Sequence, residues 1–422
     1  MNDEITRGEK VLTVGFLTGA QMIVFMIRFA LPIAAPTLMT LYGIEPETMG
    51  YILSGWNWSY TGVLLFAGPV VDWIGPWLAM GLGSIVWGLS TLALPLAGTV
   101  AGLFVMRLVF GLGQGILIPS TAASVSRLFT PDERTRALAV AFSGNQVGLA
   151  AGAGVATFIL VWLGWEAIFY FLGGVSLLLT LAWFLFYPDK RVGRNEKTQA
   201  SGTDAEATQR FRWRSLFRFR STGGLALGQF GYLYSYFFFI AWLPSYLVLE
   251  RNMTDLRSGF SSALVFMVGM LGTLGGGWLG DYLLKRGMDR TRCRKTIIGG
   301  GLAISFVLVV SAAYVVETEV AVALLAAGVG FMRLATGSVH SLPIELAPKQ
   351  IVASLASVQN FAGNVGGLLA PILSGYLVQQ TGSFESSVMV AGVMALLGAV
   401  GFVFLVGELK VFELSENTSV KA

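Results

Sequence analysis

The sequence predicts an all-α membrane protein whose twelve transmembrane helices form two halves of six. Three observations lead to this fold class: the composition, the length of the apolar segments, and the distribution of lysine and arginine. The 422-residue chain is 55% hydrophobic and only 12% charged, with a mean hydropathy of +0.69. Soluble proteins carry about 25% charged residues. The composition therefore excludes a water-soluble enzyme, a disordered chain and a nucleic-acid-binding protein.

Each predicted span is a run of mostly apolar residues long enough to cross a bilayer. A helix rises about 1.5 Å per residue, so a hydrocarbon core about 30 Å thick needs about 20 residues. The runs lie at about 11–41, 48–71, 78–98, 101–129, 137–163, 165–187, 221–249, 258–283, 296–316, 318–346, 351–379 and 384–407. The one long connection, 188–220, is polar. We expect it to be a cytoplasmic linker between an N-terminal half (1–187) and a C-terminal half (221–422).

The distribution of lysine and arginine predicts the orientation in the membrane. With both termini in the cytoplasm, 23 of the 28 Lys and Arg residues lie on the cytoplasmic side, and only Arg251 and Arg257 lie on the opposite side. Such a bias is the rule for membrane proteins. It also explains the isoelectric point of about 9.1 without a nucleic-acid partner. We expect a multi-pass protein of the cytoplasmic (inner) membrane with both termini inside.

Other features of the sequence exclude further classes of protein. A single cysteine, Cys293, excludes a disulfide framework and a cysteine-based metal cluster. The sequence contains no metal-ligand cluster, phosphate-binding loop or nucleophile–base spacing. We therefore expect no metal, no cofactor and no catalytic residues. The polar first ten residues and the long apolar run after them predict no cleaved signal peptide.

Matching pairs of residues in the two halves indicate an internal repeat. The offsets between the pairs are 209, 219 and 226 residues, so the symmetry is weak. The pairs are Gly68 and Asp72 with Gly277 and Asp281, Gly144 and Asn145 with Gly363 and Asn364, and Arg107 and Gln114 with Arg333 and His340. The first set lies at helix ends and is predicted to contribute to gating. Two such halves are typical of a transporter that binds its substrate between them.

Short motifs follow one another in a fixed order along nearly the whole chain. They are Ala34-Ala35-Pro36 after Arg28, Gly68-Pro-Val-Val-Asp72, Pro131-Asp-Glu-Arg134, Trp242-Leu-Pro244, Gly277-Trp-Leu-Gly-Asp281, Pro343-Ile-Glu345 and Asn360-Phe-Ala-Gly363-Asn364. In this order the chain resembles the anion:cation symporter family of the major facilitator superfamily, which includes galactonate, hexuronate, glucarate and phthalate permeases and the vesicular glutamate transporters. The resemblance implies the major facilitator fold and alternating access.

The chain departs from that family at three places. Ile27 stands where many proton-coupled members have an acidic residue before the arginine of span one. Gln114 stands where a glutamate is usual, and Trp73 and Trp77 replace basic residues after Asp72. The first two departures remove the residues most often credited with carrying protons. The usual route of proton coupling is therefore expected to be absent.

Three arginines, Arg28, Arg107 and Arg333, lie inside predicted spans. An arginine at mid-bilayer costs roughly 2.5–3.5 kcal/mol, so each must face water, a partner or a cavity. Arg28 and Arg333 lie too deep along their helices to reach a surface easily. Arg107 is about 10 Å from the end of its span by the helical rise. For Arg107, extension of the side chain to the membrane surface is therefore an alternative.

No aspartate or glutamate lies in the central part of any predicted span. Internal ion pairs are therefore not expected to neutralise the three arginines, and a positive cavity will attract an anion. Guanidinium groups bind carboxylate, sulfonate and phosphate oxygens in pairs. For Arg333 the alternative is a guanidinium group that backbone carbonyls or asparagines of neighbouring helices satisfy. If Arg333 instead meets Arg28 or Arg107, their repulsion favours a doubly anionic ligand.

Polar residues of the same spans complete the candidate substrate site. Each has a structural alternative: packing for the tyrosines, helix bridging for the amides, and a hydrogen-bonded structural role rather than proton transfer for the single histidine. The candidates are Tyr60, Gln114, Asn145, Gln146, Tyr236, His340, Asn360 and Asn364. Gln114 lies two turns from Arg107 on the same helical face.

The most consistent interpretation is a monomeric secondary transporter that moves a small organic anion, such as a sugar acid or an aromatic acid. Its partners would be the substrate, the lipid bilayer, and a co-transported cation or an exchanged counter-anion. One alternative is an exchanger or uniporter without proton coupling, and another is a sulfonate or dicarboxylate carrier. A channel or a membrane sensor is the weakest candidate.

Overall fold

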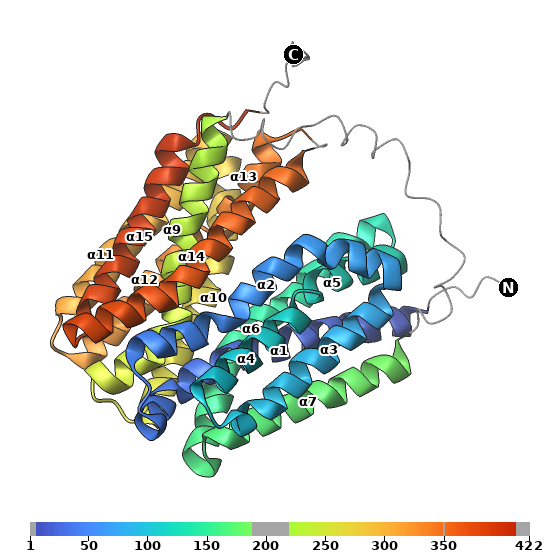
Figure 1. Ribbon diagram of the computed structural model, residues 1–422. Coiled ribbons are helices and arrows are strands. Elements are labelled where there is room, and N and C mark those ends of the chain that lie inside the picture. The colour runs from blue at the N-terminus through green and yellow to red at the C-terminus, as the bar shows by residue number, and fades with distance from the viewer. Residues whose placement is uncertain (1–5, 188–218, 349–350, 411–422) are drawn as a thin grey trace, which may run out of the picture.

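The computed structural model describes residues 6–187, 219–348 and 351–410, and within these ranges the chain is helical and contains no strand (Figure 1). The all-α fold class is therefore confirmed. The predicted linker lies almost wholly outside the described residues. The helices of the first half are α1 (Arg7–Tyr42), α2 (Pro46–Ile74), α3 (Pro76–Ala93), α4 (Val100–Gln114), α5 (Leu117–Leu128), α6 (Pro131–Leu163) and α7 (Trp165–Phe186).

The second half has the same plan. Its helices are α9 (Arg220–Ser245), α10 (Asp255–Lys285), α11 (Arg290–Tyr314), α12 (Thr318–Leu334), α13 (Thr336–Leu346), α14 (Val352–Thr381) and α15 (Glu385–Val400). Single turns at Leu94–Ala97, Tyr246–Glu250 and Gly401–Leu405 extend α3, α9 and α15. Each predicted span coincides with one of these helices or with a pair of them.

The fourth and tenth spans differ from the prediction, because each consists of two short helices rather than one. The first break lies between α4 and α5, beside Gly115. The second lies at Ala335, between α12 and α13, where the hydroxyl of Thr336 donates to the Arg333 carbonyl at 2.7 Å. A hydroxyl that donates to a nearby backbone carbonyl competes with the backbone hydrogen bonds of the helix and often bends it. Both breaks follow an arginine of the candidate site.

Eleven helical segments in the described ranges are long and apolar enough to cross a membrane. The remaining predicted span is α2, which is 29 residues long but carries polar residues such as Ser54, Asn57 and Ser59. Asn57 is 1% exposed and donates from its Nδ2 to the Asn364 carbonyl at 2.9 Å. Asn57 of α2 therefore contacts the other half of the protein, whereas Ser59 bonds to α4 of its own half.

The two halves meet mainly along three helix pairs, α2 with α14, α6 with α10, and α1 with α9. Glycines bring α2 and α14 together: a Cβ on Gly50 would lie 2.4 Å from the Pro371 carbonyl oxygen, and one on Gly375 would lie 2.3 Å from that of Pro46. Both contacts lie near the end of the bundle where α2 begins. Backbone therefore packs directly on backbone at this end, as small residues permit between membrane helices.

The opposite end of the bundle, where α1 begins and α2 ends, is arranged differently. There α5 packs against α1, α2, α3 and α6, whereas α13 packs against α10, α11, α12 and α14, so each stays with its own half. Figure 1 shows the two groups of helices diverging toward this end. The protein is thus closed at one end of the bundle and splayed at the other.

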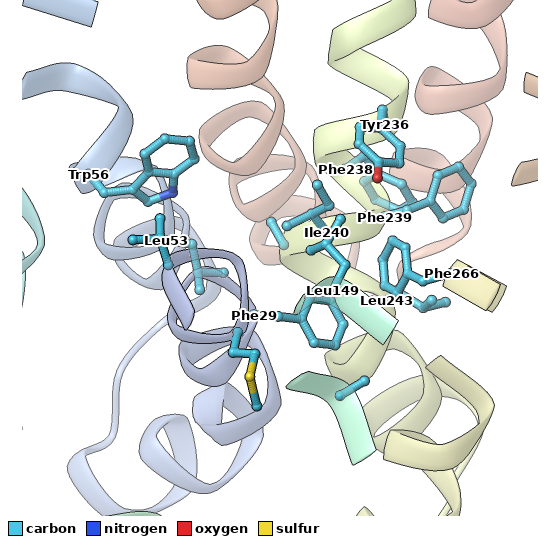
Figure 2. Close-up of a cluster of buried hydrophobic side chains, with 14 of the residues drawn as sticks. Phe29, Leu53, Trp56, Leu149, Tyr236, Phe238, Phe239, Ile240, Leu243 and Phe266 are labelled. Atoms are coloured by element: carbon cyan, nitrogen blue, oxygen red, sulfur yellow. The ribbon is translucent and has the colours of Figure 1, made fainter. Parts of the chain in front are cut away.

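Aromatic and aliphatic side chains fill the centre of the interface between the halves (Figure 2). Phe29 of α1 meets Phe266 of α10 edge to face, with ring centroids 4.9 Å apart. Trp56 of α2 lies 5.8 Å from Phe237 of α9, with the rings nearly parallel. Such pairs stabilise by about 0.5–1.5 kcal/mol beyond their burial. The candidate arginines lie around this cluster.

A second glycine contact holds α2 against α4 inside the first half. A Cβ on Gly111 would lie 2.0 Å from the Trp56 carbonyl oxygen, and one on Gly55 would lie 3.0 Å from the Arg107 Cβ. The Ser59 hydroxyl donates to the Leu108 carbonyl at 2.6 Å. This close approach places Trp56 and Arg107 on adjoining turns of two helices.

We expect Gly111→Leu to destabilise the protein by about 1–3 kcal/mol, because the new side chain would force α2 away from α4. Thermal unfolding of the purified protein in detergent measures the effect. The matched control is Gly62→Leu, since Gly62 is an exposed position of α2 with no atom within 4 Å of a Cβ built there. Equal stability of the two variants would contradict the packing described.

Candidate functional site

Arg28 lies in α1 with its guanidinium group among aromatic rings. The guanidinium carbon is 3.8 Å from the ring centroid of Trp56, 4.5 Å from that of Phe25 and 5.3 Å from that of Tyr60. The residue is 9% exposed, and its Nε has no hydrogen-bond partner in the structure. A guanidinium–ring contact contributes about 0.5–2 kcal/mol, more when it is shielded from water. The rings thus compensate part of the cost of burial, the Tyr60 hydroxyl is a hydrogen-bonding partner of the guanidinium group, and the Nε–H stays free to donate.

Arg107 lies in α4 and is 1% exposed. Its side chain packs against Gly55, and its guanidinium carbon is 5.4 Å from the Phe110 ring centroid. Its Nε also has no partner, and the group lies close enough to Arg28 to experience its positive charge. The side chain is therefore enclosed within the first half rather than extended to a membrane surface.

Arg333, at the end of α12, is held by the second half. Its Nη1 donates to the Tyr232 hydroxyl at 3.0 Å, and its guanidinium carbon lies 4.5 Å from the Tyr236 ring centroid. The Tyr232 hydroxyl is 2.9 Å from the hydroxyl of Thr336, which itself donates to the Arg333 carbonyl. Tyr232 must therefore be the donor to Thr336. The acceptor for Arg333 is thus a phenol, not the carbonyls or asparagines of the structural alternative.

Tyr236 connects the arginines of the two halves. Arg333 lies over its ring, and its edge-to-face neighbour Phe237 stacks on Trp56, whose ring lies over Arg28. In the described part of the chain, none of the three arginines forms an ion pair with a carboxylate. Three positive charges therefore surround an aromatic cluster without a counter-charge, and in a medium of low dielectric constant their mutual repulsion is considerable.

Two of the predicted amide side chains have unpaired atoms. Gln114, in α4 like Arg107, is 1% exposed, and its Oε1 has no partner. The Oδ1 of Asn145 in α6 also lacks one. A buried polar atom without a partner costs about 1–3 kcal/mol. Both oxygens can therefore accept a hydrogen bond from a ligand at little further desolvation cost.

Other amide side chains of the predicted site form hydrogen bonds within the protein. For these residues the structural alternative to ligand binding was the bridging of helices. Gln146 Nε2 reaches the Thr273 hydroxyl of α10 at 3.4 Å, across the interface between the halves. Asn364 Nδ2 donates to Asn360 Oδ1 at 2.8 Å, and its carbonyl accepts from Asn57. Asn360 is exposed, as is His340, two turns from Arg333. In the part of the chain that the structure describes, the hydrogen bonds of these residues go to partners other than the three arginines.

The glycine–aspartate pairs lie away from the arginines, toward the splayed end of the bundle. Asp72 near the end of α2 and Asp281 in the last turns of α10 are both exposed. Nothing lies within 4 Å of a Cβ built on Gly68 or Gly277. Space is therefore open around both motifs in this arrangement of the halves.

The sequence did not point to several residues that shape the site. Phe25 and Trp56 surround Arg28, yet aromatic residues are too frequent in this chain to be singled out. Gln21 is another: it is completely buried in α1, and neither amide atom has a partner. The spacing could have identified Gln21, because a residue seven positions before Arg28 lies on the same face of the helix.

Two helical halves that enclose uncompensated cationic side chains are the arrangement of a membrane transport protein rather than an enzyme. Residues 17–371 match the Major Facilitator Superfamily, and the chain belongs to that superfamily. A D-galactonate transporter of Escherichia coli O6:H1 (strain CFT073) is 29% identical over 421 residues, covering 95% of this chain and 96% of the relative. A hexuronate transporter of Bacillus subtilis (strain 168) is 28% identical over 398 residues, covering 94% of each.

The fold agrees with solved structures. A bacterial homologue of the human lysosomal transporter Spinster, in an inward-facing and unoccupied conformation, superimposes with a TM-score of 0.81 at 14% sequence identity. The superposition covers 95% of this chain and 98% of the homologue. At this level of identity the likeness concerns the fold alone.

Proposed function

We propose that this protein is a secondary transporter that carries a small organic anion across the cytoplasmic membrane by alternating access. The observation that carries the proposal is the set of three arginines, Arg28 and Arg107 buried in the first half and Arg333 partly buried in the second, without a carboxylate paired to any of them among the described residues. The substrates named for the relatives, galactonate and hexuronate, are organic acids and support the same class of substrate.

The acidic group of the substrate binds first to Arg28, with Arg107 adding positive charge behind it. The ring contacts of Arg28 leave the edge of the guanidinium group able to donate two parallel hydrogen bonds to a carboxylate. Tyr60, Gln114 and Asn145 supply a hydroxyl and two amides for the rest of the ligand. Binding also relieves the repulsion between Arg28 and Arg107. The substrate thus provides the counter-charge that the chain lacks.

Alternating access requires the closed end of the bundle to open and the splayed end to close. The N-terminal half (1–187) and the C-terminal half (221–422) are the moving units in this proposal. The lysine and arginine distribution supports a cytoplasmic position for the splayed end, and for both termini. The structure then corresponds to a state open toward the cytoplasm. Asp72 and Asp281, exposed here, would be covered when that end closes.

Coupling to protons through the usual residues is not part of this proposal. Ile27 is 1% exposed and apolar, and Gln114 does not titrate. The absence of a carboxylate paired with these arginines among the described residues favours exchange of one anion for another, or uniport. His340, exposed in α13, is the remaining candidate for proton transfer in the second half.

We expect Arg28→Lys to lower uptake of the substrate roughly 10- to 100-fold, because lysine keeps the charge but loses the planar pair of donors. Uptake and binding by purified protein in proteoliposomes measure the loss. Arg257→Lys is the matched control, since Arg257 is exposed and pairs with Glu319. Wild-type affinity of the Arg28 variant, with normal insertion, would remove Arg28 from the site.

We also expect counterflow of the substrate to persist in proteoliposomes without a pH gradient. An imposed gradient should change net uptake only weakly, because neither Ile27 nor Gln114 carries a proton. Comparing the wild type with His340→Gln tests whether His340 carries a proton during transport. Strong proton-driven accumulation that survives His340→Gln, with a fully ionised substrate, would contradict the proposed mode of coupling.

A further inference from the structure

We propose that Arg333, with Tyr232 and Thr336, forms a second anion-binding pole, and that the preferred substrate is a dianion with an acidic group at each end. The inference rests on the proposed function and specifies its substrate class. The first pole is Arg28 with Arg107 in the N-terminal half. The second lies in the C-terminal half, so one ligand would join the two halves.

At the second pole, hydrogen bonds to neighbouring side chains hold the positive charge of Arg333 in place. The hydrogen bonds run from Arg333 Nη1 to the Tyr232 hydroxyl, from there to the Thr336 hydroxyl, and back to the Arg333 carbonyl. This closed ring of hydrogen bonds fixes one edge of the guanidinium group. The Nε on another edge is buried and has no partner in the described structure. The group is thus oriented in advance and retains donor capacity for an acidic ligand.

Tyr236 separates the two poles. Its ring lies 4.5 Å from the Arg333 guanidinium carbon, whereas the rings that surround Arg28 are those of Phe25, Trp56 and Tyr60. The ring of Trp56, which lies over Arg28, stacks on Phe237, and Phe237 meets Tyr236 edge to face with ring centroids 6.5 Å apart. A continuous row of aromatic rings therefore links the two guanidinium groups. A single carboxylate held by Arg28 would leave Arg333 without a counter-charge, whereas a second acidic group beyond Tyr236 would supply it.

Charge balance then determines which ligand closes the carrier. A buried charge without a partner is strongly unfavourable when water is excluded. A monoanion on the first pole leaves Arg333 uncompensated as the halves close, but a dianion places one negative charge at each pole and holds the halves together. Arg333 would therefore be a specificity residue, and selection would favour two carboxylates, or a carboxylate and a sulfonate, over one acidic group.

The test uses straight-chain dicarboxylates of increasing length and the monomethyl ester of each, at a pH where all free carboxyl groups are ionised. Binding to the purified wild type and to Arg333→Gln is measured by calorimetry and thermal shift. We expect the wild type to prefer the diacid of matching length over its ester. Arg333→Gln should lose roughly 10- to 100-fold in affinity for that diacid, as expected for charge-assisted hydrogen bonds, and much less for the ester.

Three further variants test whether the effect depends on the position of Arg333 and on its hydrogen bonds. Arg257→Gln removes one positive charge far from the site and should leave the diacid-to-ester ratio unchanged. Tyr232→Phe keeps the charge of Arg333 but breaks the ring of hydrogen bonds, so the ratio should fall partway. Arg333→Lys should behave similarly, and these two variants carry the comparison if Arg333→Gln does not insert.

The possible failures are distinguishable. Equal losses for diacid and ester in the Arg333 and Tyr232 variants, or no loss for either, would overturn the second pole and leave the proposed function intact. Wild-type protein that binds monoesters as tightly as diacids would do the same. Wild-type protein that binds neither diacids nor monoacids of any length would overturn the proposed function itself.

Discussion

A guanidinium group buried between membrane helices must be given acceptors or the faces of aromatic rings, and this chain relies largely on rings. Around Arg28 the rings come from its own helix and from α2, and the ring over Arg333 comes from α9. Arg28 and Arg333 therefore each require another helix at a fixed distance, so these arginines and the helix packing determine each other. Because rings neutralise no charge, the arrangement is stable yet still attracts anions.

The spans and the buried arginines could be read from the sequence, because apolar runs of membrane length and charges inside them are local features. Their surroundings could not. Tyr232 precedes Arg333 by 101 residues, and Trp56 follows Arg28 by 28 residues on another helix. Nothing in the pattern of either segment specifies which aromatic residue faces which arginine. The breaks beside Gly115 and at Ala335 were also missed, because hydropathy continues unchanged across them.

The two halves share a plan but have different chemistry at equivalent positions. Arg107 and Arg333 occupy matching places and are each followed seven residues later by a polar side chain. Arg107 packs against a glycine in an enclosed space, whereas Arg333 is held by a phenol and a hydroxyl. Gln21 and Gln229 also match, but Gln21 is unpaired, whereas Gln229 accepts from Gln359 at 3.0 Å. The repeat has thus kept its helices while its polar contacts have diverged.

At the closed end of the bundle, glycine and proline backbone forms the contact between α2 and α14, with Gln379 donating to Glu45 and accepting from the Glu47 amide beside it. Glycine and proline have no rotamers to restrict, so forming this seam costs little side-chain entropy, and parting it releases little. Water can replace the few hydrogen bonds of Gln379. The two end states of the carrier can therefore lie close in free energy, and a ligand with modest differential affinity is enough to shift the population from one to the other.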